Sequence, residues 1–333
     1  MLEIIECKTR ADMRAFFRAA KEAGYTREEE KYLKEYAVPP LSLLSKNGPQ
    51  AYFVAKREGK PVFRALTGVD LVFNREKGEK TGYFSLFDGE SDEEAAQAIL
   101  DAVLNKQSAW GMENVIGPIS PDASGFFMGA GEGDFEKSRG IFTGPEGSFA
   151  CRLLRKNGFC PIQMENAYLI YTTNKNPLSD VTRKAEKRFD VSVVPLKPSL
   201  FSDRWMKCIL EVTKGAPEKE MRVLLERLRP FIDKRFSYAA LMNGVCAGYL
   251  VTIKGSKGIL RATTLFTSAD HFSSPAALSL IDAFLTDTQR KGIAEAEVSV
   301  INPENMRSER LVLRFGGRRI RSYTLFTKKV AQN

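Results

Sequence analysis

Residues 153–159 read LLRKNGF, and residues 311–317 read LVLRFGG. In each stretch a short apolar helix pattern runs into glycine, which favours a helix that ends at a left-handed residue. A strand pattern rich in aromatic residues follows both stretches, over 164–171 and 321–328. The same helix-to-strand signal therefore occurs once in each half of the chain, and this predicts an internal duplication.

The length of the chain supports the same division. A chain of 333 residues is longer than one hydrophobic core usually organises. The polar run 172–177, followed by the charged residues 182–188, has the composition of a linker. We therefore expect an N-terminal domain over 1–172, a linker over 173–188 and a C-terminal domain over 189–333.

Turn and cap signals predict the same order of elements in both halves. For the first half they predict a hairpin over 51–73, a strand over 81–87, a helix over 92–109, a strand over 114–119, a helix over 149–156 and a closing strand over 164–171. For the second half they predict a strand over 191–194, a hairpin over 237–253, a strand over 259–266, a helix over 275–291, a strand over 296–301, a helix over 307–315 and a closing strand over 321–328. Helices are also expected within the first 36 residues and over 203–212 and 219–232, and a long surface excursion over 120–148.

Each half resembles the GNAT (GCN5-related N-acetyltransferase) fold. The resemblance rests on the turn Asn243-Gly244 with Gly248 after it, on the two helix ends quoted above, on Asn302, and on the run WGMENVIGP at 110–118. The first half is also similar to uncharacterised bacterial double-GNAT proteins. The resemblance implies an α+β fold made of two tandem GNAT-like domains, each a mostly antiparallel sheet with a splayed parallel strand pair and flanking helices.

The phosphate-binding loop of the family does not carry over. GNAT acetyltransferases hold the CoA pyrophosphate with a Q/R-x-x-G-x-G/A loop, whose glycines let backbone amides reach the phosphate. In the second half residues 270–276 read DHFSSPA, with Ser and Pro where the glycines belong. In the first half residues 92–97 read DEEAAQ, whose carboxylates repel a pyrophosphate. We therefore expect the first half to be non-catalytic and the second half to keep any acyl-CoA site.

The general-acid tyrosine of the family is also missing, because its position holds Leu154 in one half and Val312 in the other. Tyr323 and Tyr168, on the two closing strands, are the remaining phenols for proton transfer, although aromatic residues on such strands also serve as core. The resemblance implies that Tyr323 and Asn302 lie at the acyl end of the second half's site, as its catalytic candidates.

The gap between the splayed strands of a GNAT fold holds the pantetheine arm by added-strand pairing. For the second half the resemblance implies a cofactor site made of Leu265, Phe266 and Thr267 along the arm, and of Ser273, Ser274 and Ala276 at the phosphate end. The two serines also fit as N-caps of the helix that starts at Pro275, and one role does not exclude the other. The cofactor implied is acetyl-CoA or another acyl-CoA.

Composition narrows the functional classes. A single histidine, His271, excludes sites that need two imidazoles, and five cysteines without a C-x-x-C pair indicate neither a disulfide nor a metal site. No apolar run is long enough to span a membrane, and Glu3 and Glu6 stand where a signal peptide would be apolar, so we expect a cytoplasmic protein. The net charge of +9 favours an anionic partner, and the basic run 314–321 is either a solvated edge or an anion-binding lip.

Three functions stay open from the sequence. The first is an acyl-CoA-dependent N-acyltransferase acting on a small amine or amino-acid-like molecule. The second is a Fem-type peptidyltransferase, since such enzymes are built from tandem GNAT-like domains, use aminoacyl-tRNA and need no CoA loop. The third is an inactive GNAT-like protein that binds a ligand. The sequence indicates no metal partner and leaves the oligomeric state open.

Overall fold

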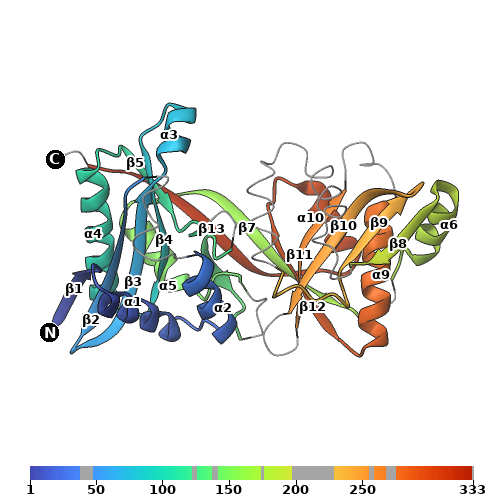
Figure 1. Ribbon diagram of the computed structural model, residues 1–333, viewed down its shortest axis with the longest axis horizontal. Coiled ribbons are helices and arrows are strands. Elements are labelled where there is room, and N and C mark those ends of the chain that lie inside the picture. The colour runs from blue at the N-terminus through green and yellow to red at the C-terminus, as the bar shows by residue number, and fades with distance from the viewer. Residues whose placement is uncertain are drawn as a thin grey trace. The chain divides into compact units, whose positions relative to one another are not determined.

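The computed structural model describes residues 1–37, 48–121, 126–136, 142–173, 176–196, 229–254, 259–267 and 275–331 (Figure 1). The chain forms two compact units. Unit 1 comprises Met1–Phe135, Phe142–Glu165 and Arg321–Asn333, and unit 2 comprises Glu136–Ile141 and Asn166–Ile320.

Unit 1 is built on a mostly antiparallel sheet in the order β1-β2-β3-β4-β5-β13. The strands are β1 (Leu2–Glu6), β2 (Gln50–Arg57), β3 (Lys60–Val69), β4 (Thr81–Gly89), β5 (Asn114–Gly117) and β13 (Arg318–Lys329). Only β4 and β5 run parallel among these neighbours, and the short β6 (Ala130–Gly133) pairs with β13. The middle of β2 and nearly all of β3 and β4 are buried on both faces of the sheet, as in Ala51–Ala55 and Val62–Val69, and their apolar side chains form much of the core.

Helices pack on this sheet in positions that their sequences explain. The helix α4 (Glu93–Ala109) begins at the N-cap Asp92, whose side chain accepts from the amide of Ala95, and it packs on β2 and β3. Its apolar stripe, with Ile99 and Val103, is fully buried in the core. The remaining helices of the unit are α1 (Arg10–Glu22), α2 (Arg27–Tyr32), the π-helical turn η1 (Leu33–Ala37), α3 (Leu71–Lys77) and α5 (Ser148–Lys156).

Unit 2 repeats the arrangement with the order β8-β9-β10-β11-β12-β7. Its strands are β8 (Val191–Pro195), β9 (Tyr238–Met242), β10 (Val245–Lys254), β11 (Leu260–Thr267), β12 (Glu295–Ile301) and β7 (Cys160–Tyr171). The helices among its described residues are α6 (Ser179–Phe189), α9 (Ala276–Arg290) and α10 (Met306–Arg314). Again only one neighbouring pair, β11 with β12, runs parallel. The predicted duplication is therefore visible in the strand order of the two sheets.

The closing strand of each half completes the sheet of the other half. The strand β7, expected to close the first half, pairs antiparallel with β12 in unit 2. The last strand, β13, pairs antiparallel with β5 and β6 in unit 1. The compact units therefore differ from the expected division at 172 and 189. The residues expected to be a linker also contain α6, which ends at Asp190 in a left-handed conformation.

Several of the described residues in the segment 120–148, expected to be a surface excursion, belong to the core, so that prediction was wrong for them. Phe126, Phe127 and Phe142 are at most 5% exposed and surround the ring of Tyr32. The carboxylate of Glu29, itself buried, accepts the backbone amide of Phe142 at 2.7 Å. Glycine and acidic residues dominate the composition of this segment, but its few aromatic residues decide where it lies.

Other differences are smaller. The strand β1 and the helix α3 were not expected, while β4, α4, α5, α9 and α10 lie within a few residues of their predicted ranges. The helix expected over 203–212, residues 219–228 of the helix expected over 219–232, and His271 lie outside the described residues. Residues 229–232 are not helical: they form a turn that ends in a β-bridge between Ile232 and Ile253. Within the described ranges no helix has the length and apolarity to cross a membrane, and no cluster of three or more metal-binding side chains occurs.

Candidate functional site

The two parallel strands of unit 2 separate part of the way along their length. The register of β11 with β12 runs through Leu260↔Ala296 and ends, in the described residues, at Ala262↔Val298. Beyond that point β11 continues to Thr267, still paired with β10 on its other side, and β12 continues to Ile301. The facing edges of the separated segments present backbone amides and carbonyls that an extended ligand can pair with.

A buried polar network lies where the strands separate. The guanidinium of Arg261 donates through Nε to Ser299 Oγ at 2.9 Å, and Ser299 Oγ donates to Glu297 Oε1 at 2.6 Å. All three residues are at most 3% exposed. A charged group this deeply buried requires a partner of opposite charge or good hydrogen bonds. The sequence did not predict this network, and its signal is the presence of a cation, Arg261, and an anion, Glu297, on two neighbouring strands.

The predicted pantetheine residues fall on the separated part of β11. Leu265 is 38% exposed, which is high for a leucine on a central strand, and Thr267 is half-buried at the strand's end. Phe266 lies between them on the backbone of β11, and its side chain is not among those described. Ala276 is the first residue of α9 and is buried. Ser273 and Ser274 lie outside the described residues.

The first turn of α9 carries no acidic residue and no side-chain cap. The matching helix of unit 1, α4, differs in both respects. Asp92 caps it and is held by two hydrogen bonds from Arg57, at 2.6 and 2.9 Å, and Glu93 binds Lys156. The Arg57 hydrogen bonds hold the pKa of Asp92 below its usual range. The N-terminus of α4 is thus already occupied by carboxylates, as the acidic sequence predicted.

The two catalytic candidates belong to different compact units. Asn302 directly follows β12 in unit 2, and its Oδ1 accepts the amide of Glu304 in the turn that leads to α10. Tyr323 lies in unit 1, where it pairs with Gly131 and is only 2% exposed. The separation follows from the exchange of closing strands, since β13 pairs with β5 and β6.

Tyr168, the phenol on the other closing strand, lies in unit 2 beside β12. It lies opposite Val298, the last residue of β12 that pairs with β11. Its hydroxyl donates to Glu309 on α10 and accepts from Asn166 Nδ2 at 3.4 Å. Burial, followed by the hydrogen bond to Glu309, raises the pKa of Tyr168 to about 12, so the phenol keeps its proton at neutral pH.

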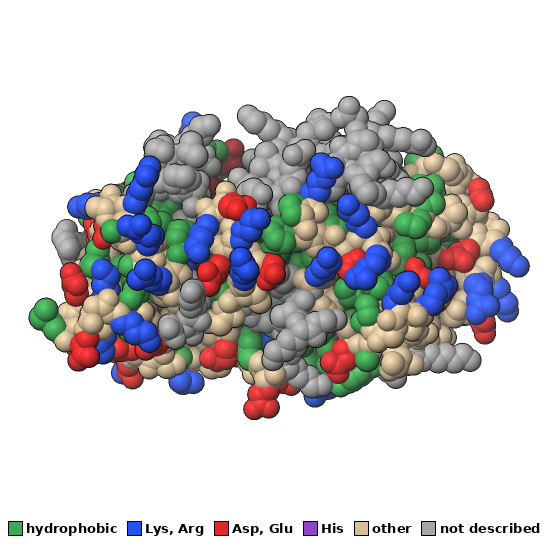
Figure 2. Space-filling view, turned by 60° about the horizontal axis from the view of Figure 1, so that its bottom comes forward, with side chains coloured by type: hydrophobic (Ala, Val, Ile, Leu, Met, Phe, Trp, Pro, Cys, Tyr) green, Lys and Arg blue, Asp and Glu red, His purple; other side chains and the backbone are tan. Residues whose placement is uncertain are grey.

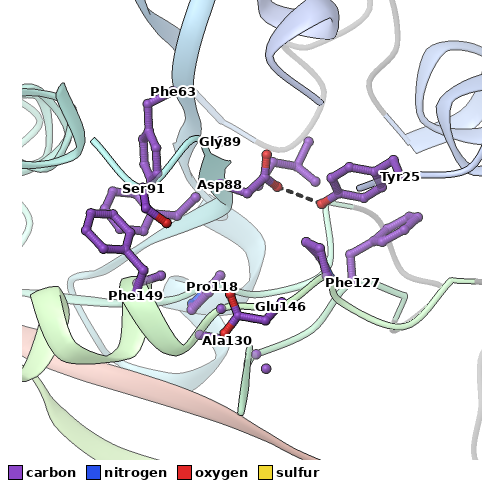
Figure 3. A pocket seen from close by; sticks show the side chains of 17 residues that line it. Tyr25, Phe63, Asp88, Gly89, Ser91, Pro118, Phe127, Ala130, Glu146 and Phe149 are labelled. Atoms are coloured by element: carbon purple, nitrogen blue, oxygen red, sulfur yellow. Dashed lines mark hydrogen bonds between the residues drawn. The ribbon is translucent and has the colours of Figure 1, made fainter. Parts of the chain in front are cut away.

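Unit 1 has a pocket where β4 and β5 separate (Figure 3). Its volume is about 50 Å³, which is room for a few water molecules. Figure 3 shows Phe63 and Phe149 on one side of the pocket and Tyr25 and Phe127 on the other, with the hydroxyl of Tyr25 directed at Asp88. That hydrogen bond is 2.6 Å long, and burial raises the pKa of Tyr25 well above its usual range.

Comparison with solved structures identifies the fold. A tandem GNAT protein from the clavulanic acid biosynthesis pathway superposes with a TM-score of 0.65 and 12% identity, and the match covers 100% of both chains. A GCN5-related N-acetyltransferase from Sphaerobacter thermophilus matches with a TM-score of 0.56 and 12% identity, covering 99% of this chain and 96% of that one. The glucosamine N-acetyltransferase region of a fungal multi-domain GH3 beta-N-acetylglucosaminidase matches with a TM-score of 0.62 and 14% identity, covering 98% of this chain and 38% of that one.

The chain therefore has the tandem GNAT fold that its motifs predicted. No protein-family model matches the sequence. No curated protein matches it either. At identities this low the likeness establishes the fold and leaves the activity to be argued from the site.

Proposed function

We propose that the protein is an N-acyltransferase that takes an acyl group from acetyl-CoA or another acyl-CoA and transfers it to a small amine. The observation that carries the proposal is the separation of β11 from β12 beyond Ala262↔Val298. The pantetheine arm would pair with the backbone of Leu265 to Thr267, and the phosphates would lie near Ser273, Ser274 and the start of α9. The absence of a carboxylate from the first turn of α9 supports this orientation.

In this reaction the amine nitrogen attacks the acyl carbon and loses one proton, the carbon–sulfur bond breaks, and the CoA thiolate takes up one proton, so the overall proton count is unchanged. We assign the proton donor of unit 2 to Tyr168, because it is neutral at pH 7 and lies across β12 from the point of separation. Asn302, at the end of β12, would lie at the acyl end and orient the reacting group.

Kinetics of two single variants test the assignment of the donor. Tyr168→Phe removes the hydroxyl and is expected to lower kcat about 100-fold with little change in KM, which is the usual size of a general-acid effect. Tyr323→Phe, on a buried strand residue of unit 1, is the matched control and should leave kcat within about twofold. The opposite pattern would move the acyl end to unit 1 and contradict the assignment.

Unit 1 we propose to be non-catalytic. Asp92 and Glu93 fill the N-terminus of α4 with negative charge, and both are paired with cations of unit 1. A pyrophosphate at that position would meet two carboxylates and would have to displace Arg57 or Lys156 from them.

Calorimetric titration of the full chain with acetyl-CoA and longer acyl-CoAs tests the donor. Ser274→Glu places a carboxylate two residues ahead of α9 and is expected to weaken binding by about 1 kcal/mol or more. Asn105→Glu, which adds the same charge on the exposed side of α4, is the control and should bind as the parent does. If no acyl-CoA binds a folded sample, the acyltransferase proposal fails.

The Fem-type alternative rests on the missing glycine-rich loop and the net charge of +9. Two observations place it second. Arg321, part of the basic run 314–321, is buried and donates to the carbonyl of Asp134, so this run is not a continuous exposed lip. On the face in Figure 2 the Lys and Arg side chains are interspersed with Asp and Glu. A salt-dependent mobility shift with aminoacyl-tRNA, in a sample that does not bind acyl-CoA, would favour the Fem-type alternative over the acyl-CoA proposal.

A further inference from the structure

The helix α10 of unit 2 has one buried side and one exposed side. Val312 and the C-cap Phe315 are at most 8% exposed and belong to the core of the unit, and Leu311 packs against the same core. With about 3.6 residues per turn, the residues that point away from the core share one continuous face. We call it the α10 face, and its exposed residues are Met306, Arg307, Arg310, Leu313 and Arg314.

The charge on and beside this face is mostly positive. Between positions 304 and 319 the chain has five arginines, all of them exposed, and two glutamates. One of the glutamates, Glu309, accepts the hydroxyl of Tyr168 on the inner side of the helix. Within the part of the chain that the structure describes, Arg310, Arg314 and Arg318 form no hydrogen bond or ion pair. Their charges are therefore available to a partner.

The spacing of these cations does not stabilise the fold. Arg310 and Arg314 are four residues apart on one side of α10, and like charges at this spacing destabilise a helix. Exposed cations on other helices are paired: Arg183 of α6 lies 3.5 Å from Asp180, and Arg155 of α5 lies 2.8 Å from Glu132. The α10 face thus keeps positive charge that its own helix does not use, which favours an anionic partner.

The apolar residues of the face indicate which anionic partner fits. Met306 is 59% exposed and Leu313 is 51% exposed, and both lie beside Arg310. A surface for single-stranded nucleic acid stacks bases on aromatic side chains, but the aromatic residue next to this face, Phe315, is buried. Arginines combined with long aliphatic side chains instead fit an anionic bilayer surface, where the cations meet lipid phosphates and the aliphatic groups enter the headgroup region.

We propose that the α10 face docks on a membrane surface rich in anionic phospholipids. Arg310, Arg314 and Arg318 contact the lipid phosphates. Met306 and Leu313 lie among the headgroups. This goes beyond the proposed transfer reaction, and it stands whether or not the protein uses acyl-CoA.

Co-sedimentation of the full chain with lipid vesicles tests the surface. The protein should bind vesicles of equimolar phosphatidylcholine and phosphatidylserine, and it should stay in solution with vesicles of phosphatidylcholine alone. The binding should weaken as the salt concentration rises. The double variant Arg310→Gln/Arg314→Gln should lower the affinity at least about tenfold, because one cation near an anionic bilayer contributes about fivefold.

Matched variants on α6 separate the α10 face from the net charge of the chain. Lys184→Gln/Lys187→Gln removes the same charge from exposed positions of α6 and should bind within about twofold of the parent protein, because charges farther than a Debye length from the bilayer are screened. Leu313→Gln should weaken binding about threefold or more. Val181→Gln, at a residue of α6 that is 57% exposed, is its control and should bind like the parent protein.

Thermal melting separates binding from folding. Arg310→Gln/Arg314→Gln removes a repulsion between like charges, so this variant should melt at the temperature of the parent protein or above it. The proposal is overturned if the anionic vesicles are not bound, if the neutral vesicles are bound equally well, or if the α6 double variant weakens binding as much as the α10 double variant. It also fails if Leu313→Gln binds like the parent protein while single-stranded RNA of mixed sequence displaces the vesicles, because the face would then be a nucleic-acid surface.

Discussion

Arg64 is a charged residue of unit 1 with no exposed surface, and Asp88 is the carboxylate that pairs with it. Its Nε donates to Asp88 Oδ1 at 2.7 Å, and the guanidinium lies over the rings of Phe16 and Tyr25. Asp88→Asn keeps the shape and removes the charge. We expect a loss of about 3 kcal/mol or more in the free energy of unfolding, because removal of one partner leaves a buried charge unpaired.

Urea denaturation followed by circular dichroism measures this loss. The control is Glu90→Gln, which breaks the ion pair of Glu90 with Lys60 at the solvent-exposed end of the same region. Exposed pairs contribute about 1 kcal/mol or less, so the control should lie close to the parent protein. If both variants lose the same free energy of unfolding, the buried ion pair of Arg64 with Asp88 stabilises the fold no more than the exposed pair of Lys60 with Glu90.

The pair of Asp92 with Arg57 has a signature in the pH dependence of stability. Because Arg57 holds the pKa of Asp92 below its usual value, the pair stabilises the fold above about pH 4, and that contribution is lost as the pH falls through the folded-state pKa. Asp92→Asn keeps an N-cap and lacks the charge. The stability difference between parent and variant, at most about 1 kcal/mol at pH 7, should shrink toward zero in acid.

Urea titrations at several pH values between neutral and acid measure that difference. On the background of Arg57→Gln, the substitution of Asp92 should change the pH dependence less, since the partner that lowers the pKa is gone. A difference that stays constant with pH in both backgrounds would contradict the assignment of the pair.

At the scale of the elements, local signals were sufficient where a cap or a turn sets the boundary. Asp92 at the start of α4 and Asn157-Gly158 at the end of α5 are such signals, and both helices lie where the sequence predicted. The segment 120–148 has no comparable signal. Its conformation depends on tertiary contacts of Phe126 and Phe142 with Tyr32, which are distant in sequence and which no local pattern reports.

The burial of this segment predicts a large effect of one truncation. Phe142 has no exposed surface and stacks on Phe126 at a centroid distance of 4.6 Å. Phe142→Ala should lower the free energy of unfolding by about 3–5 kcal/mol, the range for a buried aromatic residue. Phe73→Ala, on the exposed side of α3 at 41% exposure, is the control and should cost less than about 1 kcal/mol. Chemical denaturation of both variants measures the contrast, and a small loss at Phe142 would mean that the segment is peripheral.

At the scale of the whole molecule, the sequence predicted the order of elements in each half and the tandem fold, but not the partner of each closing strand. The residues of β13 have the same alternation whether they pair with β12 or with β5, so the pattern contains no information on the choice. The same choice decides the unit in which each closing-strand tyrosine lies. Tyr323 and Asn302 were assigned to one site, while Tyr168, the other phenol considered, lies next to β12.

The exchange of strands predicts that the first half does not fold alone. Residues 1–172 lack β13, so β5 and β6 lose their antiparallel partner and the core of unit 1 loses Phe326 and Val330. Loss of the buried Phe326 alone lowers the free energy of unfolding by about 3–5 kcal/mol, which is a large share of the stability of a domain. The edge of β5 that is left unpaired can also pair with other chains and so cause aggregation. The fragment 1–172 should therefore show no cooperative melting transition and should elute as aggregate in gel filtration.

Two experiments serve as controls. The same fragment, extended by a Gly/Ser linker and residues 318–331, contains β13 in the same chain and should regain a cooperative transition. Co-expression of 1–172 with 173–333 should yield a stable complex of the two halves. A fragment 1–172 that melts cooperatively at the temperature of the extended one would show that β13 is dispensable for unit 1.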